Sequence, residues 1–124
     1  MANLVRQKAV KQIYRFLVQK AQNKQTTYYE EIAIKFQHLG LHISGSALGA
    51  CLSPNLEDIF KWCQERGQPP ITSLVVRKSG ADEGLPGVGF WIALGLPSMS
   101  SRKSDYKRNV VEVLHQQVFN YYSM

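Results

Sequence analysis

Two cysteines and three histidines are the side chains best suited to metal binding or nucleophilic catalysis. Zinc sites hold such ligands in matched pairs, and a catalytic cysteine needs a histidine beside it. His38 and His42 are one helical turn apart, but Gly40 between them is expected to interrupt the helix. Cys51 and Cys63 form no CxxC pair and lie in apolar surroundings, and His115 stands alone. We therefore expect no metal site and no cofactor.

A glycine-rich loop and two carboxylate pairs are the remaining candidates for catalysis. The stretch from Gly84 to Gly89 is spaced like a phosphate loop, but it lacks the GK[ST] ending and leads into a predicted strand. Glu30 and Glu31, like Asp82 and Glu83, are adjacent and show no partner that would tune them for acid–base work. The sequence predicts a binding protein rather than an enzyme.

Positive charge is the property that suggests a partner. The net charge of +6 and the pI of about 9.5 favour a phosphate backbone or an acidic protein. Lys8, Lys11 and Arg15 share one arc of a predicted N-terminal helix, where they either track phosphates or form a solvated face. The predicted nucleic-acid contacts are Lys8, Lys11, Arg15, Ser44, Ser46, Arg77, Lys78, Arg102, Lys103, Lys107 and Arg108.

Helical periodicity predicts that most of the chain is helical, and these helices position the candidate residues. Helices are expected near 3–22, 28–39, 45–52, 54–66 and 105–121. Thr27 and Glu30 match a capping box, and Ser53 with Pro54 suits a helix start. In the last helix Asp105 is the expected cap, and the predicted inner residues are Tyr106, Val110, Val113, Leu114 and Tyr121.

Two apolar runs between these helices predict a β-hairpin. Ile71–Val76 is rich in β-branched residues, and Val88–Leu94 follows a loop dense in glycine and proline. Antiparallel strands are expected near 71–77 and 88–94. The predicted fold class is α+β, a mainly helical, winged-helix-like domain with a hairpin wing and a C-terminal helix.

Length and composition set the expected organisation. The 124 residues and an apolar share of 44 % predict one domain, with a core over 1–95, a linker over 96–104 and a last helix over 105–121. No apolar run approaches the ~20 residues of a membrane helix, and charge interrupts the N-terminus. We expect a cytoplasmic protein with no membrane partner and no small-molecule substrate.

Three stretches share a pattern with a known DNA-binding domain, namely Thr27-Tyr28-Tyr29-Glu30-Glu31-Ile32-Ala33, Ser46-Ala47-Leu48-Gly49-Ala50 and Ser53-Pro54-Asn55. They resemble the winged helix-turn-helix of the alkylguanine-DNA alkyltransferases and alkyltransferase-like proteins, over residues 26–91. The resemblance implies the fold and a surface that faces DNA. Ile71 or Thr72 stands at the reactive cysteine, and Gly45 or Ser46 at the arginine of the recognition helix. Alkyl transfer and base flipping are therefore not implied.

Two functions are consistent with this sequence. The first is non-catalytic binding to DNA or RNA, without strong sequence specificity because the expected third helix has no Arg, Lys, Asn or Gln between Ser44 and Ser53. The second is a protein-binding inhibitor, such as a bacterial immunity protein or an antitoxin that neutralises a nuclease toxin. Its predicted anchors are aromatic: Tyr28, Tyr29, Trp62, Trp91, Tyr121 and Tyr122.

Overall fold

The computed structural model describes residues 2–36 and 48–123, and the side chains of 8–36 and 55–123. The elements are α1 (Ala2–Gln22), β1 (Thr27–Tyr28), α2 (Tyr29–Lys35), α3 (Leu48–Glu65), the 3-10 helix η3 (Ile71–Leu74), β2 (Val75–Val76), α4 (Val88–Ala93), the 3-10 helix η4 (Pro97–Ser101) and α5 (Ser104–Tyr121). The class is α+β, as predicted, with mostly helices and one small sheet.

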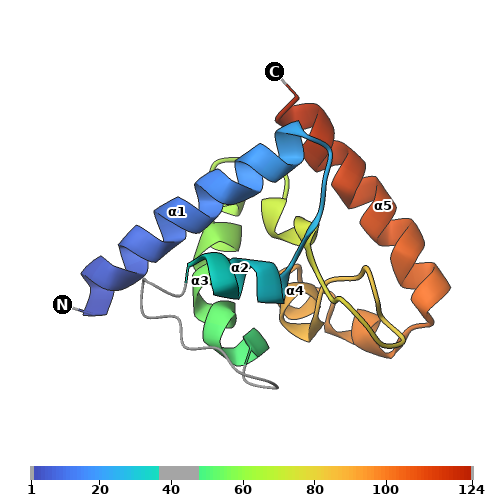
Figure 1. Ribbon diagram of the computed structural model, residues 1–124. Coiled ribbons are helices and arrows are strands. Elements are labelled where there is room, and N and C mark those ends of the chain that lie inside the picture. The colour runs from blue at the N-terminus through green and yellow to red at the C-terminus, as the bar shows by residue number, and fades with distance from the viewer. Residues whose placement is uncertain (1, 37–47, 124) are drawn as a thin grey trace.

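The two long helices, α1 and α5, converge at their C-terminal ends (Figure 1). The main apolar core lies beneath this junction and is built from α1, α2, α3, η3, β2 and α5. Its buried members are Ile13, Phe16, Leu17, Ala21, Ile32, Phe36, Ile59, Cys63, Ile71, Leu74, Val75 and Val118. In α1 and α2 the buried residues recur at helical spacing, as expected from the periodicity that predicts these helices.

A second apolar cluster lies where α4 and η4 meet α3 and α5. It contains Phe60, Leu85, Phe90, Trp91, Met99 and Val111. Phe90 packs edge-on against both Phe60 and Trp91, with ring centroids 6.0 and 5.4 Å apart. The predicted linker over 96–104 includes the 3-10 helix η4, and Met99 of η4 is buried in this cluster.

The predicted hairpin is wrong. Val75–Val76 pairs in parallel with Thr27–Tyr28, with Thr27 opposite Val75. Val88–Ala93 is a helix, which buries Phe90 and Trp91 and leaves Val88 and Ile92, one turn apart, exposed. Residues 71–76 are buried at every position. Their apolar, β-branched composition therefore reflects burial and does not show that they form one strand of a hairpin.

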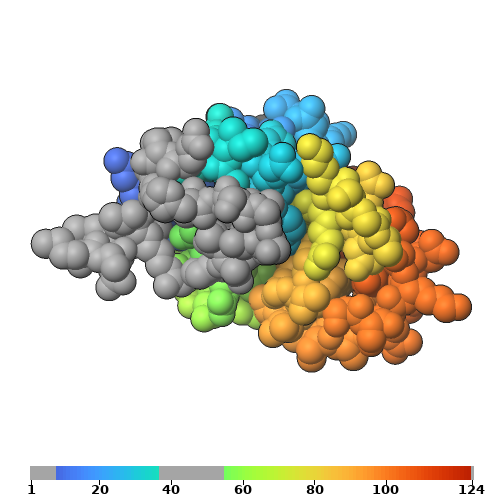
Figure 2. Space-filling view, turned by 60° about the horizontal axis from the view of Figure 1, so that its bottom comes forward, coloured from blue at the N-terminus to red at the C-terminus, as the bar shows by residue number. Residues whose placement is uncertain are grey.

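Segment 77–85 instead closes on itself. The Arg77 amide donates to the Leu85 carbonyl at 2.9 Å, and the Gly84 amide donates to the Arg77 carbonyl at 2.8 Å. Gly80 and Gly84 have φ angles of 92° and 79°, which side-chain-bearing residues rarely adopt. Figure 2 shows this segment beside α2 on one face of the molecule, and Lys78 makes a 3.8 Å ion pair with Glu30 there.

Several predicted helix boundaries also need correction. Ser53 and Pro54 lie inside α3 and do not start a helix. Thr27 belongs to β1, and its hydroxyl donates to Glu31 at 2.8 Å instead of capping α2. Asp105 lies in the first turn of α5, behind the N-cap residue Lys103. The predicted helix end near residue 39, with Gly40 after it, lies outside the described residues.

The inner face of α5 also differs from the prediction. Its buried residues are Lys107, Val111 and Val118, whereas Tyr106, Val113 and Tyr121 are about half exposed. Val110 and Leu114 are half-buried beside the second cluster. Over the described residues, no helix combines the length and apolar character that crossing a membrane requires.

Candidate nucleic-acid interface

The solvent face of α1 carries three cations. Lys8, Lys11 and Arg15 are all exposed, and at 3.6 residues per turn they fall within an arc of about 60°. Ala9, Ile13, Phe16 and Leu17 on the other side are buried in the core and fix the helix orientation. No acidic side chain among residues 8–36 and 55–123 forms an ion pair with these cations. We call these three residues the α1 basic face.

An apolar pocket of about 320 Å³ lies between α1 and α3, next to this face. Its lining residues are Val10, Lys11 and Tyr14 from α1 and Asp58, Ile59 and Trp62 from α3. Lys11 belongs both to the pocket and to the α1 basic face. The Tyr14 and Trp62 rings meet edge to face, with centroids 4.8 Å apart and an interplanar angle of 72°.

Contacts around the pocket hold both rings in place. The Tyr14 and Tyr122 hydroxyls are hydrogen-bonded at 3.0 Å, which ties α1 to the end of α5. Burial raises the pKa of Tyr14 and of Tyr122, so both phenols remain neutral at physiological pH. The Arg66 guanidinium lies 4.0 Å from the centroid of the Trp62 ring. Tyr14 is not among the predicted site residues, although Val10 and Tyr14, like Asp58 and Trp62, are spaced one helical turn apart.

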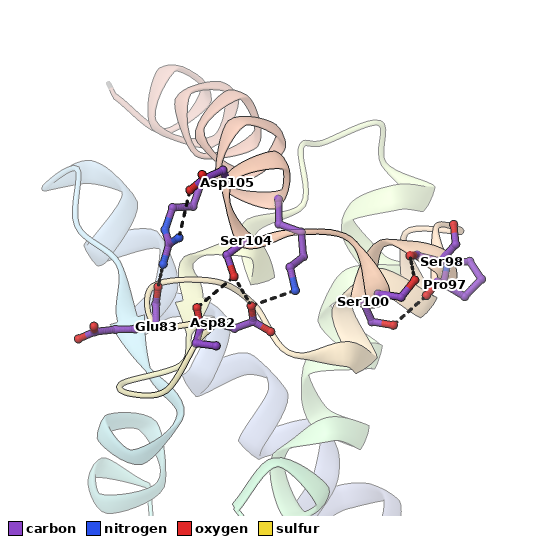
Figure 3. Close-up of polar contacts among 11 residues, drawn as sticks. Asp82, Glu83, Pro97, Ser98, Ser100, Ser104 and Asp105 are labelled. Atoms are coloured by element: carbon purple, nitrogen blue, oxygen red, sulfur yellow. Dashed lines mark hydrogen bonds and ion pairs between the residues drawn. The ribbon is translucent and has the colours of Figure 1, made fainter.

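Lys107 is not available to a phosphate. It is only 3 % exposed, and its Nζ lies 2.9 Å from Asp82 Oδ1. Figure 3 shows Ser104 and Asp82 directed toward each other, and the Ser104 hydroxyl donates to Asp82 at 3.0 Å. The hydrogen bond from Lys107 holds the pKa of Asp82 below its usual value. The predicted role of Lys107 in nucleic-acid binding does not fit this burial, and its charge instead anchors the closed loop to α5.

The other predicted cations lie on the surface away from α1. Arg108 donates to the Glu83 carbonyl at 3.1 Å, and Arg102 lies over the Tyr106 ring at 5.3 Å. Arg77 and Lys103 are exposed. Of the full predicted set, only the three α1 residues lie together on one helix face without forming an ion pair to a described acidic side chain. Ser44 and Ser46 lie outside the described part of the chain.

The predicted aromatic anchors have different environments. Trp91 is 1 % exposed within the second core cluster, so its prediction as a surface anchor is wrong. Tyr29 is largely enclosed, and its hydroxyl accepts a 3.0 Å hydrogen bond from the Gly87 amide. Tyr28 and Tyr121 are exposed, whereas Trp62 and Tyr122 are half-buried beside the main core.

His115 and the hydroxyls of Thr72 and Ser73 lie in or beside η3, where they are at least partly buried. His115 Nε2 lies 2.7 Å from the Ser73 carbonyl oxygen, and burial lowers the pKa of this imidazole. The Thr72 and Ser73 hydroxyls are buried and have no hydrogen-bond partner in the described part of the chain. No group of three or more metal-ligating side chains occurs within the described ranges.

Comparison of the chain with protein-family models, with curated proteins and with solved structures finds no match.

Proposed function

We propose that the protein is a non-catalytic, cytoplasmic binding protein that contacts the DNA or RNA backbone through the α1 basic face. One observation carries this proposal: Lys8, Lys11 and Arg15 are exposed together on a helix whose opposite side is fixed in the core. Phosphate contacts of this kind contribute affinity without reading sequence. Base-specific recognition is not part of the proposal.

We propose that the fold is related to the winged helix, with a different structure in place of the hairpin wing. In this proposal α2 and α3 correspond to the helix-turn-helix pair, and the closed segment 77–85 takes the place of the wing. Arg77 and Lys78 at the start of that segment are exposed, and Lys78 is paired with Glu30 at 3.8 Å. A hairpin wing is not part of it, because Val88–Ala93 is helical.

The test compares two variants with the same loss of charge. Lys8→Gln/Lys11→Gln/Arg15→Gln removes the α1 basic face, and Lys24→Gln/Lys35→Gln/Lys61→Gln removes three exposed lysines elsewhere. The proposal predicts that the first variant loses at least tenfold affinity for DNA and RNA at low salt, uniformly across sequences. The control should lose much less. Equal losses would show that net charge, not the α1 basic face, carries binding.

A second candidate function is inhibition of a single protein, such as a nuclease toxin. The observation in its favour is the exposure of Tyr28 and Tyr121, since aromatic side chains are frequent anchors of protein interfaces. This function predicts a stable complex that is lost on replacing Tyr28, Tyr121 or Trp62 and retained in the α1 charge variant. Loss of the complex in the charge variant alone would contradict it.

A further inference from the structure

The pocket between α1 and α3 has the size and walls of a site for one flat, aromatic group. Its volume of about 320 Å³ lies at the lower end of the roughly 300–1,000 Å³ that small-molecule sites occupy. Tyr14 and Trp62 supply aromatic surface, and Val10 and Ile59 supply aliphatic surface. Such walls favour a planar ring system, because aromatic groups gain from stacked and edge-to-face contacts.

The pocket is organised before any ligand arrives. Tyr14 is held by its hydrogen bond to Tyr122 and by its edge-to-face contact with Trp62. Trp62 is held between Tyr14 and the Arg66 guanidinium. Rings that are already fixed lose little conformational freedom on binding, which favours affinity.

The charges around the pocket indicate what the aromatic group is attached to. Lys11 stands at the α1 side, with Lys8 and Arg15 on the next turns of the same face. Arg66 adds a cation one turn beyond Trp62 on α3. Of these cations, three lie on the α1 side and one lies on the α3 side. An anionic ligand therefore has its charge along α1 and its ring inside the pocket.

We propose that this pocket takes one nucleobase of single-stranded DNA or RNA, while the flanking phosphates lie on the α1 basic face. The inference rests on the proposed function and specifies its ligand. A base in a duplex is stacked and paired and is not available to the pocket, whereas an unpaired base is. Proteins that bind single strands combine a cationic track with aromatic side chains in this way.

Three labelled ligands separate base binding from backbone binding. They are (dT)12, an abasic strand with the same number of phosphates, and the 12-base-pair (dA)·(dT) duplex. Because one base would gain aromatic contacts in the pocket, the wild type should bind (dT)12 roughly tenfold more tightly than the abasic strand. It should also prefer (dT)12 to the duplex, although the duplex has the higher charge density.

Variants at Trp62 test whether the preference arises in this pocket. Trp62→Leu should weaken (dT)12 binding about tenfold and leave abasic binding unchanged, whereas Trp62→Phe should retain most of the preference because it keeps a ring. Tyr106→Leu is the matched control, since it removes an exposed aromatic side chain from the first turn of α5. Circular dichroism and thermal unfolding establish that each variant is folded.

The possible results distinguish this inference from the function on which it rests. Equal wild-type binding of (dT)12 and the abasic strand would overturn the base site and leave backbone binding intact. A preference that survives in folded Trp62→Leu would also overturn it, as would a Trp62→Leu variant that weakens both strands equally. If no nucleic acid binds, the proposed function and the base site fall together.

Discussion

At the residue scale, Lys107 shows most clearly what local sequence conceals. Its type and its basic neighbours predict a surface position, yet it is buried because Asp82, far away in the chain, neutralises it. Charged side chains are rarely buried unless they are paired. The buried face of α5 includes Lys107, whereas Tyr106 and Val113, which were predicted to face inward, are exposed. Helical periodicity alone cannot reveal an ion-pair partner that the tertiary fold supplies.

The two halves of this pair should differ in their effect on stability. Asp82→Ala leaves the Lys107 ammonium buried without its counter-charge, and we expect a loss of about 3 kcal/mol in the free energy of unfolding. Lys107→Met keeps the aliphatic stem and leaves Asp82 partly exposed, bonded to Ser104, so the loss should stay below about 1.5 kcal/mol. Urea unfolding of both variants measures the order, and the reverse order would contradict the assigned burial.

At the element scale, the elements from residue 71 to residue 94 are held by contacts to distant helices. The two apolar runs could be recognised from the sequence, but their pairing could not. Val75–Val76 pairs with the residues before α2, and α4 is linked to α2 through Tyr29 and Gly87. A dense glycine loop is compatible with a hairpin and with a strand followed by a helix, so only tertiary contacts decide between them.

A double-mutant cycle tests the contact between α2 and α4. An alanine Cβ at Gly87 would stand 3.1 Å from the Tyr29 hydroxyl, so Gly87→Ala should destabilise by about 1 kcal/mol through crowding. Tyr29→Phe removes the hydroxyl that accepts the Gly87 amide hydrogen bond and should cost a similar amount. Because Phe also removes the crowding atom, the double variant should cost about 0.5–1 kcal/mol less than the sum. Strict additivity would mean that the two residues do not touch.

The docking of α5 on η3 should depend on pH through His115. Burial lowers the pKa of this side chain, so the folded state favours neutral imidazole more strongly than the unfolded state does. The resulting stability is fully present above the ordinary pKa of about 6.5 and is lost as pH falls through the lower folded value. Stability should therefore decrease from pH 7 to pH 5.

His115→Gln isolates this contribution, because an amide can still donate to the Ser73 carbonyl but does not titrate. The other titrating groups are unchanged, so the difference between wild type and variant reports His115. Chemical unfolding at several pH values should show a shallower decrease for the variant. Parallel profiles would exclude a His115 contribution.

At the scale of the whole molecule, sequence predicts best what is local. The bounds and burial of α1 and the bounds of α5 follow from periodicity, and so does the α1 basic face, because all its members lie on one helix. The pocket could not be predicted, since its walls come from α1 and α3 and meet only when both pack on the core. The cations of the candidate site can therefore be predicted from the sequence, because they lie on one helix. Its aromatic walls cannot, because they come together only in the tertiary fold.

The salt dependence of binding shows how many phosphates the α1 basic face contacts. Three phosphate contacts predict a slope of log affinity against log salt of about −2 for a single strand and about −3 for a duplex, since each contact contributes about 0.7 or 0.9. Between 50 and 200 mM salt, single-strand affinity should thus fall roughly 20-fold. Lys8→Gln/Lys11→Gln/Arg15→Gln should flatten the slope by about 2 or more. A wild type with no salt-dependent affinity for DNA or RNA at low ionic strength, or a variant with an unchanged slope, would contradict nucleic-acid binding by the α1 basic face.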